Sequence, residues 1–222
     1  MTKIYIVRHC EAIGNVKRLF QGTSDYDISE MGAKQLEFLT ERFENIQLER
    51  VYTSPLIRTV KTAKAVVGKR NIEIVPYKGL IEIDGGFLEG RPFDETFLQY
   101  PDLADKWNNA PHEFAPKNGE PMKLAYERIW NTVLSLAKEN AGKTIAAATH
   151  GGVIRCLACR LIKGNIEQLK EVGWSDNTAV ALIEFDDDFN ARLVYYNDHS
   201  HLPDGYLPKR SNISDFTKQV SK

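Results

Sequence analysis

The sequence contains little cysteine and no long apolar run. Three cysteines, Cys10, Cys156 and Cys159, occur among 222 residues, an odd and sparse set that indicates reduced thiols rather than a disulfide framework. No apolar run approaches the ~20 residues needed to cross a bilayer. The short apolar stretch at the N-terminus runs directly into charged residues, unlike a signal peptide. We therefore expect a cytoplasmic protein that does not enter a membrane.

The sequence also lacks an excess of charge of either sign. Its 29 Lys and Arg residues nearly cancel 30 Asp and Glu residues, for a net charge of −1. Nothing global therefore favours nucleic acid or an anionic membrane surface, and any bound anion must be held by local positive charge. A Walker phosphate-binding loop is absent, which argues against nucleotide hydrolysis by that route. No heptad or apolar edge indicates an oligomeric state, which stays undetermined.

Short apolar segments alternate with amphipathic ones along most of the chain. Strands are predicted at residues 4–7, 50–53, 72–75 and 144–148, with a late antiparallel hairpin at 179–185 and 192–196. One helix is expected to start near Ser29, and another to start with Ser54 as N-cap and Pro55 as its first residue. The pattern predicts an α/β fold, a three-layer α/β/α sandwich with a mainly parallel sheet.

A proline-rich stretch at about residues 84–122 interrupts this alternation. We interpret it as a small helical insertion over the C-terminal ends of the strands, within a single domain spanning 1–222. Its aromatic side chains either shape the mouth of a substrate site or form a small core of the insertion itself. A polar tail is expected from about Ser211.

Unusual polar residues stand where three predicted strands end. Arg8 and His9 follow the first strand, Ser54 and Arg58 the second, and His150 the strand at 144–148. Ligands of open α/β sheets bind beyond the C-terminal ends of the strands, so two arginines and two histidines would converge there. Arginine offers a planar fork that matches phosphate oxygens, and helix N-termini add backbone donors. This arrangement predicts a pocket for a dianion.

The same residues lie in short motifs that resemble those of the histidine phosphatase superfamily, also called the phosphoglycerate mutase-like family. The motifs occupy residues 8–15, 20–22, 29–32, 53–59, 80–82, 87–90, 118–120 and 149–155. Each motif alone is weak, but together, in the order of the family and over about residues 4–180, they are specific. The resemblance implies a phosphoric monoester hydrolase of branch 1 that acts on small phosphate monoesters.

The resemblance also implies roles for individual residues. The catalytic set is Arg8, His9, Arg58, Glu82 and His150, and the substrate-binding set is Asn15, Gln21, Gly22 and Gly151. His9 would attack phosphorus to give a phosphohistidine, and Glu82 would protonate the leaving oxygen and then activate water. We expect no metal and no cofactor, because Arg8 and Arg58 supply the positive charge that phosphoryl transfer needs.

Two other functions are compatible with parts of the sequence. Cofactor-dependent phosphoglycerate mutases of this family resemble Glu-Arg-His-Tyr-Gly after the acidic residue and carry paired arginines in the insertion. Here Glu82 is followed by Ile-Asp-Gly-Gly, and the insertion has no adjacent arginines to hold a substrate carboxylate. The phosphatase is therefore preferred. A catalytically inactive phosphoryl-binding protein is less favoured because His9 and Arg58 are both present. The physiological substrate, and whether specificity is broad or narrow, stay open.

Some assignments have nearby alternatives. Glu73, Asp84 and Glu89 lie close to Glu82 in sequence and compete with it for the role of acid. Cys10 stands where the family usually has glycine, and we favour a packed neutral thiol over a reactive one.

Other candidate sites have simpler structural explanations. Cys156 and Cys159 have the spacing of a redox or zinc motif, but they fall in an apolar helix without a second ligand pair, which favours core packing. His199 and His201 could bind a metal, although a hydrogen-bonded loop is favoured. Glu11 is expected to cap or pair rather than react.

Overall fold

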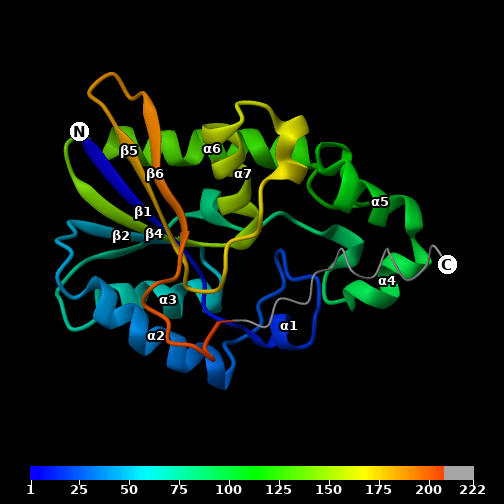
Figure 1. Ribbon diagram of the computed structural model, residues 1–222, viewed down its shortest axis with the longest axis horizontal. Helices are drawn as coiled ribbons and strands as arrows, with labels where there is room; N and C mark the ends of the chain where they lie inside the picture. Colours follow the sequence, from blue (N-terminus) through cyan, green and yellow to red (C-terminus); the bar gives the residue numbers. More distant parts are fainter. Residues whose placement is uncertain (208–222) are drawn as a thin grey trace.

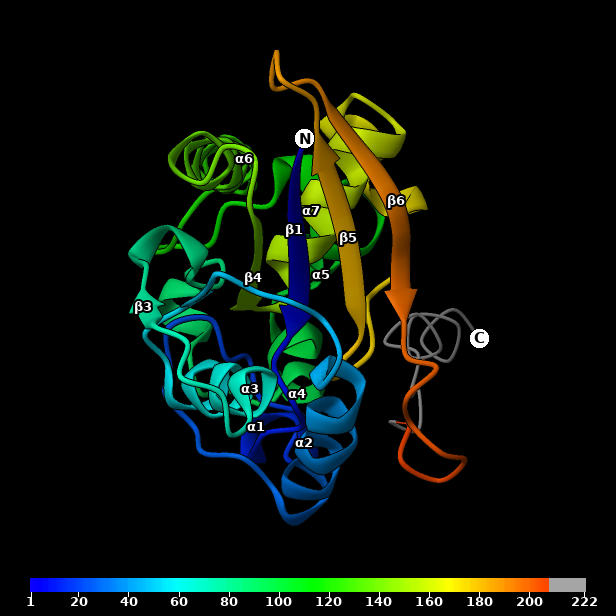
Figure 2. The ribbon, with the colours of Figure 1, turned by 90° about the vertical axis from the view of Figure 1, so that its left-hand side faces the viewer.

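The structure, a computed structural model, describes residues 1–207 as a six-stranded sheet covered by helices on both faces (Figure 1). The strands are β1 (Thr2–Arg8), β2 (Arg50–Thr53), β3 (Ile74–Pro76), β4 (Thr144–Thr149), β5 (Val180–Phe185) and β6 (Ala191–Asp198). Their order is β3-β2-β4-β1-β5-β6. The first four strands are parallel, and β5 and β6 run antiparallel to their neighbours. Figure 2 shows β1, β5 and β6 side by side. The predicted sandwich with a mainly parallel sheet is confirmed, and the polar tail expected from Ser211 lies outside the described residues.

The helices divide between the two faces of the sheet. They are α1 (Ile13–Val16), α2 (Glu30–Phe43), α3 (Ile57–Val67), α4 (Phe93–Gln99), α5 (Pro101–Asn109), α6 (Met122–Glu139) and α7 (Gly151–Ile162). Short 3₁₀ segments occupy Lys78–Leu80, Gly86–Leu88, Pro111–Glu113 and Ile166–Glu171. In Figure 1, α6 and α7 lie on one side of the sheet, and α2 and α3 lie on the other. No helix in the described part of the chain has the length and apolar character needed to cross a membrane.

Alternating side chains of the central strands pack into two separate hydrophobic cores, one on each face of the sheet. Ile4 and Ile6 of β1 are buried with residues of α6 and α7, whereas Val7 is buried with Leu39 and Phe43 of α2. This is the two-residue period of a strand covered on both faces. Full burial of each such side chain stabilises the fold by about 1.5–3 kcal/mol. The strand ends that carry the polar residues are therefore held between two packed layers.

The start of α3 differs from the prediction. The helix begins at Ile57, not at Pro55, and Ser54 does not cap it. Instead, Oδ1 of Asp25 accepts a hydrogen bond from the amide of Ile57 at 2.7 Å. The hydroxyl of Ser54 is hydrogen-bonded to Nε2 of His150 at 2.8 Å. The prediction was wrong because groups distant in sequence satisfy both the serine and the helix terminus.

The third strand is shifted along the chain from its predicted position. It occupies Ile74–Pro76, where it pairs with β2 at the edge of the sheet. Proline is tolerated in an edge strand because its missing amide faces no partner.

The segment predicted as an insertion contains α4 and α5, which lie away from the N-terminal ends of the strands in Figure 1. Its aromatic rings pack together: the ring centroids of Trp107 and Phe114 are 4.8 Å apart, and those of Phe93 and Phe97 are 5.5 Å apart. Phe20, which precedes the insertion, joins this cluster at 5.2 Å from Phe93.

Candidate active site

Parallel pairing brings the polar residues that follow three strands to one edge of the sheet. Arg8 of β1 lies opposite Thr149 of β4, and the amide of His9 donates to the carbonyl of Thr149 at 2.9 Å. The strand β2 is also parallel to β4, so Ser54, which follows β2, lies at the same edge of the sheet. The ring centroids of His9 and His150 are 5.3 Å apart. The structure thus brings together the residues that the strand pattern placed at this edge.

A cavity of about 860 Å³ opens at this edge of the sheet. Most of the predicted site residues line it: Arg8, His9, Asn15, Gln21, Gly22, Glu82 and Gly151. Arg58 and His150 do not line the cavity, and both are fully buried behind its wall.

His9 is held in one neutral tautomer. Its Nδ1 lies 2.7 Å from the carbonyl oxygen of Cys10. A carbonyl can only accept, so Nδ1 carries the proton and Nε2 keeps its lone pair. Burial, followed by the charges of Arg58 and Arg8, lowers the pKa of His9 well below its ordinary value. The ring is therefore neutral near neutral pH, and Nε2 carries an unprotonated lone pair.

The segment that precedes β5 holds the backbone of His9 from the other side. The Nδ2 group of Asn177 donates to the carbonyl of His9 at 2.9 Å, across 168 residues of sequence. The next residue, Thr178, has φ of 58°, a left-handed conformation that residues other than glycine rarely adopt. The carbonyl of Ser175 accepts a hydrogen bond from Nη1 of Arg8. Sequence reasoning missed these residues, because no local pattern marks a contact of such range.

Arg58 orders the loop that forms one wall of the cavity. Its Nη2 donates to the carbonyls of Gln21 and Gly22 at 2.9 and 3.0 Å, and its Nη1 donates to Ser24 at 2.8 Å. A Cβ atom on Gly22 would lie 2.1 Å from the carbonyl oxygen of Ile83, so glycine permits this close approach. Burial lowers the pKa of Arg58, but an arginine keeps its proton at any physiological pH.

Glu82 lies on the cavity wall opposite the N-terminus of α7. One carboxylate oxygen accepts from the amide of Gly152 and the other from the amide of Ile83, each at 2.9 Å. A Cβ atom on Gly152 would lie 2.5 Å from the carboxylate, so a side chain there would displace it. Burial raises the pKa of Glu82, although the two amides and then Arg58 and Arg8 oppose that rise. A carboxyl group with a raised pKa suits an acid.

The three competing carboxylates are engaged elsewhere and do not line the cavity. Glu89 accepts from two loop amides and from the hydroxyl and amide of Ser24. Asp84 accepts from the amide two residues further on, and Glu73 pairs with Arg50 at 2.9 Å on the surface. The geometry therefore favours Glu82 among these four.

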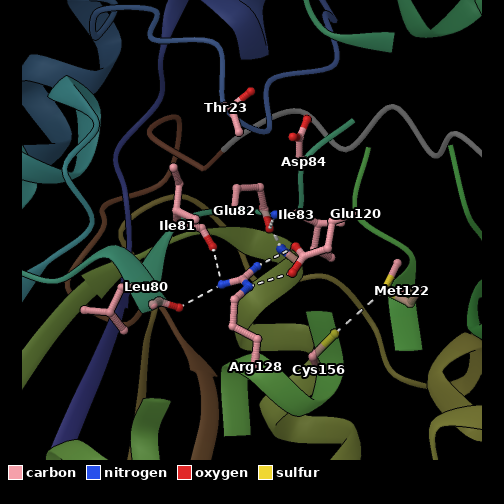
Figure 3. A network of polar contacts seen from close by, with 12 residues as sticks. Thr23, Leu80, Ile81, Glu82, Ile83, Asp84, Glu120, Met122, Arg128 and Cys156 are labelled. Atoms are coloured by element: carbon pink, nitrogen blue, oxygen red, sulfur yellow. Dashed lines mark hydrogen bonds and ion pairs between the residues drawn. The ribbon is translucent and has the colours of Figure 1, made fainter. Parts of the chain in front are cut away.

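Arg128 of α6 anchors the segment that carries Glu82 (Figure 3). Its Nε and Nη2 each donate to Glu120 at 2.7 Å, a bidentate ion pair. Its Nη1 donates to the carbonyls of Gly79 and Ile81 at 2.8 and 3.1 Å. Figure 3 shows the guanidinium between Glu120 and the peptide that precedes Glu82. Sequence reasoning assigned Arg128 no role.

Cys10 contributes to the site through its backbone. Its side chain is fully buried, its amide donates to the hydroxyl of Thr62 at 3.1 Å, and its carbonyl binds His9. Burial raises the pKa of the thiol to about 12. Its backbone is not among the left-handed positions of the chain, so the family glycine is not required here for conformation. These observations fit a packed, neutral thiol.

The other two cysteines pack in the core. Cys156 and Cys159 are buried on α7, with the sulfur of Cys156 lying 3.9 Å from that of Met122. Within residues 1–207, no group of three or more histidine, cysteine or acidic side chains is arranged to hold a metal ion. Glu11 accepts from the hydroxyl of Ser29 at 2.6 Å, which confirms its predicted pairing role.

The late histidines form part of a hydrogen-bonded loop. Nδ1 of His201 lies 3.2 Å from Arg42, and its Nε2 lies 3.2 Å from the hydroxyl of Thr178. His199 lies 3.6 Å from the carboxylate of Asp176. The favoured interpretation of these two residues is confirmed.

Two aromatic residues of the insertion combine features of both interpretations. Phe93 and Trp107 belong to the small aromatic cluster and also line the cavity. Arg155, Lys170 and Trp174 also line the cavity, and the sequence pattern predicted no role for them. The ring of Trp174 stacks on that of Trp107 at 5.7 Å between centroids.

Comparison with known proteins agrees with this geometry. The model of the histidine phosphatase superfamily (branch 1) matches residues 4–199. Phosphoserine phosphatase 1 of Hydrogenobacter thermophilus is 28% identical over 213 residues, which cover 96% of this chain and 100% of the relative. Phosphoglycerate mutase-like protein 4 of Arabidopsis thaliana is 27% identical over 209 residues, covering 92% of this chain and 89% of the relative.

Solved structures show the same architecture. Bacillus stearothermophilus YhfR is 32% identical with a TM-score of 0.86, and the match covers 90% of this chain and 99% of that protein. The alpha-ribazole phosphatase from Shigella flexneri, at 23% identity and a TM-score of 0.78, shares the fold over 88% of this chain and 96% of its own. Since the family model spans nearly all of the described residues, the chain belongs to branch 1 of the histidine phosphatase superfamily.

Proposed function

We propose that this chain is a metal-independent phosphatase that hydrolyses small phosphate monoesters through a phosphohistidine on His9. The observation that carries the proposal is the state of His9. Its Nδ1 donates a hydrogen bond to the carbonyl of Cys10. The ring is neutral and lines the cavity, so Nε2 keeps its lone pair. Such a nitrogen is a ready nucleophile toward phosphorus.

The charges around His9 suit a phosphoryl group. Arg8 lines the cavity and Arg58 lies behind its wall. The helix α7 begins at the same edge of the sheet, so its N-terminus adds backbone donors there. Within the described chain, Nε of Arg8, Nε of Arg58 and Nδ1 of His150 are buried without a hydrogen-bond partner. Buried polar atoms normally find partners, so Nε of Arg8 on the cavity wall fits a negatively charged oxygen of a transferring phosphoryl group, while Arg58 adds its positive charge from behind the wall. Fixed positive charge of this kind supplies most of the catalysis of phosphoryl transfer.

The reaction then has two steps. In the first, Nε2 of His9 forms a bond to phosphorus, the bond between phosphorus and the ester oxygen breaks, and the carboxyl group of Glu82 gives its proton to the leaving oxygen. In the second, the Glu82 carboxylate takes a proton from water as the water oxygen attacks phosphorus. The bond between phosphorus and nitrogen breaks, which releases inorganic phosphate and restores neutral His9 and protonated Glu82. Division into two steps lowers the barrier of each.

The relatives and the cavity support a small organic phosphate as substrate. The 28% identical relative is named a phosphoserine phosphatase, and the cavity of about 860 Å³ is much larger than a phosphate ion. Its volume lies in the range of typical small-molecule sites, about 300–1,000 Å³.

The proposal is tested by phosphate release from a panel of monoesters with a chelator present. His9→Ala is compared with wild type and with the control His112→Ala, which changes a half-buried histidine of the insertion outside the cavity. We expect release to survive chelation, to persist in the control and to vanish in His9→Ala. A radiolabelled substrate should leave an acid-labile phosphoenzyme in wild type and in the control, but not in His9→Ala.

Three results would reject the proposal. These are full activity in His9→Ala, loss of activity on chelation, and interconversion of phosphoglycerate isomers without net phosphate release. The last would indicate a mutase.

A further inference from the structure

Arg155 is a buried cation on the cavity wall whose hydrogen bonds are only partly used. Its side chain is 7% exposed and lines the cavity. Its Nε donates to the carbonyl of Val172 at 2.8 Å and its Nη2 to that of Leu169 at 2.9 Å. No described residue bonds to Nη1. The guanidinium also lies 4.7 Å from the ring centroid of Trp174, which fixes its plane.

No carboxylate of the described chain neutralises Arg155. It makes no ion pair there, and the groups that oppose the effect of burial on its pKa are Cys156, Tyr196 and Cys159. A buried charge without a counter-ion is costly, and carbonyls and a ring face offset that cost only in part. The exposed Lys170 lines the same side and forms no ion pair within the described residues. Lys170 also interacts with the adjacent carboxylate of Glu171, so the positive charge that no carboxylate of the described chain offsets is that of Arg155.

Acidic residues on the cavity wall have other partners. Glu11 accepts from the hydroxyl of Ser29, and Asp176 accepts from the side chain of Asn197. Glu82 is the proposed acid. Positive charge around Arg155 is thus available to a ligand.

This charge lies close to the phosphoryl position. A Cβ atom on Gly151 would lie 3.2 Å from Nε of Arg8 and 3.4 Å from the ring of Trp174. Arg155 follows Gly151 by four residues on α7, a rise of about 6 Å. A small substrate can span this distance if its second anion lies a few bonds from the ester oxygen. Its phosphoryl group would then lie near Arg8 and its second anion near Arg155.

Building on the proposed function, we propose that Arg155, assisted by Lys170 and the ring of Trp174, forms a second anion subsite. It selects monoesters whose leaving group carries a carboxylate or a second phosphate. The insertion lacks the paired arginines that would bind a substrate carboxylate. In this proposal Arg155 of α7 and Lys170 of the following segment supply that positive charge.

The test compares three related monoesters, of which one lacks a second anion and the other two carry one. In 3-phosphoglycerate a carboxylate replaces the hydroxymethyl group of glycerol 3-phosphate, and glycerol 1,3-bisphosphate supplies a second phosphate. One hydrogen bond to a charged group corresponds to about a 10- to 100-fold preference. We expect wild type to show at least such a ratio of kcat/KM for the glycerate or the bisphosphate over glycerol 3-phosphate. Which of the two ranks higher identifies the natural second anion.

Substitutions then assign the preference to residues. We expect Arg155→Gln to reduce the ratio about tenfold or more and Lys170→Gln to reduce it a few-fold. Arg160→Gln is the matched control on the same helix. Its guanidinium lies 5.3 Å from the ring centroid of Trp130 and pairs with Glu127, outside the cavity, so the ratio should equal that of wild type.

Several outcomes would overturn the subsite. A wild-type ratio near one rejects it outright, as does an equal loss on all substrates in folded Arg155→Gln, which would show that Arg155 only holds the carbonyls of Val172 and Leu169. If Arg155→Gln fails to fold by its thermal melt, Lys170→Gln decides, and an unchanged ratio there rejects the proposal. Absence of His9-dependent phosphate release from every monoester would instead reject the proposed function itself.

Discussion

At the scale of the residue, the carboxyl group of Glu82 is subject to opposing effects. Burial raises its pKa above the ordinary 4.5, while two amides and two arginines hold it down. The proton donor is the protonated form, which exists below the folded pKa. Turnover limited by leaving-group protonation should therefore fall as pH rises through that pKa.

We predict that Glu82→Gln abolishes the fall of turnover with rising pH that titration of Glu82 causes. Hydrolysis of alkyl phosphates should fall by about 10²–10⁴-fold, the usual contribution of a general acid. Hydrolysis of p-nitrophenyl phosphate should fall much less, because that leaving group needs little protonation. Profiles of kcat against pH for the two esters provide the measurement, with Glu73→Gln as a surface control. An equal loss on both esters would remove the acid role from Glu82.

Cys10 acts through its carbonyl, not its thiol. We predict that Cys10→Gly keeps kcat within about threefold while lowering the free energy of unfolding by about 1–2 kcal/mol, from added backbone freedom and lost packing. Steady-state kinetics and urea titration measure the two effects. A large loss of turnover in a folded variant would assign the thiol a direct part in the reaction.

At the scale of the element, α6 determines where Glu82 lies. Arg128 joins this helix to Glu120 and to the carbonyls of Gly79 and Ile81. We predict that Arg128→Gln lowers the free energy of unfolding by about 1–3 kcal/mol. It should also reproduce, in weaker form, the preference of Glu82→Gln for the nitrophenyl ester. Thermal melts and the ratio of the two ester rates test this. A variant that is destabilised but keeps the wild-type ratio would show that Arg128 serves stability alone.

The elements also show what the sequence can predict. Apolar runs followed by polar residues located β1, β2 and β4, and their parallel pairing placed His9 and His150 together. Local pattern failed where a distant group decides the outcome, as at Ser54, which binds His150 instead of capping a helix. Local pattern predicted no role for Asn177 or Arg128, because the backbone carbonyls to which they bond lie far away in the sequence. The fold and the set of proposed site residues follow from local pattern and motif, whereas the groups that position those residues follow from tertiary packing.

At the scale of the whole molecule, two buried neutral histidines link stability to pH. Burial and nearby arginines lower the pKa of His9 and His150 well below 6.5. The unfolded chain binds protons at about pH 6.5, but the folded chain does not. The stabilisation is complete above that pH and is lost as pH falls toward the folded pKa values. The slope is at most about 1.4 kcal/mol per pH unit for each histidine.

We therefore predict that the free energy of unfolding falls by about 2–4 kcal/mol between pH 7.5 and 5. In His9→Ala the fall should be smaller than in wild type but not absent, because His150 and His201, whose pKa burial lowers to about 4, still contribute. Urea titration across this range is the measurement. Carboxylates with lowered pKa, such as that of Asp198, lose their contribution only at more acidic pH, so they do not obscure the effect. A flat profile from pH 7.5 to 5 would contradict it.

The central position of β1 also constrains the order of assembly. This strand precedes the other described strands in the sequence, yet its neighbours in the sheet are β4 and β5, at residues 144–149 and 180–185. Its backbone hydrogen bonds must wait until those residues have been synthesised, and closing such long loops slows folding. Nascent fragments that end before β5 contain His9 but lack Asn177, which bonds to its backbone carbonyl. Catalytic competence should therefore arise late in biosynthesis, when the hairpin of β5 and β6 joins the sheet.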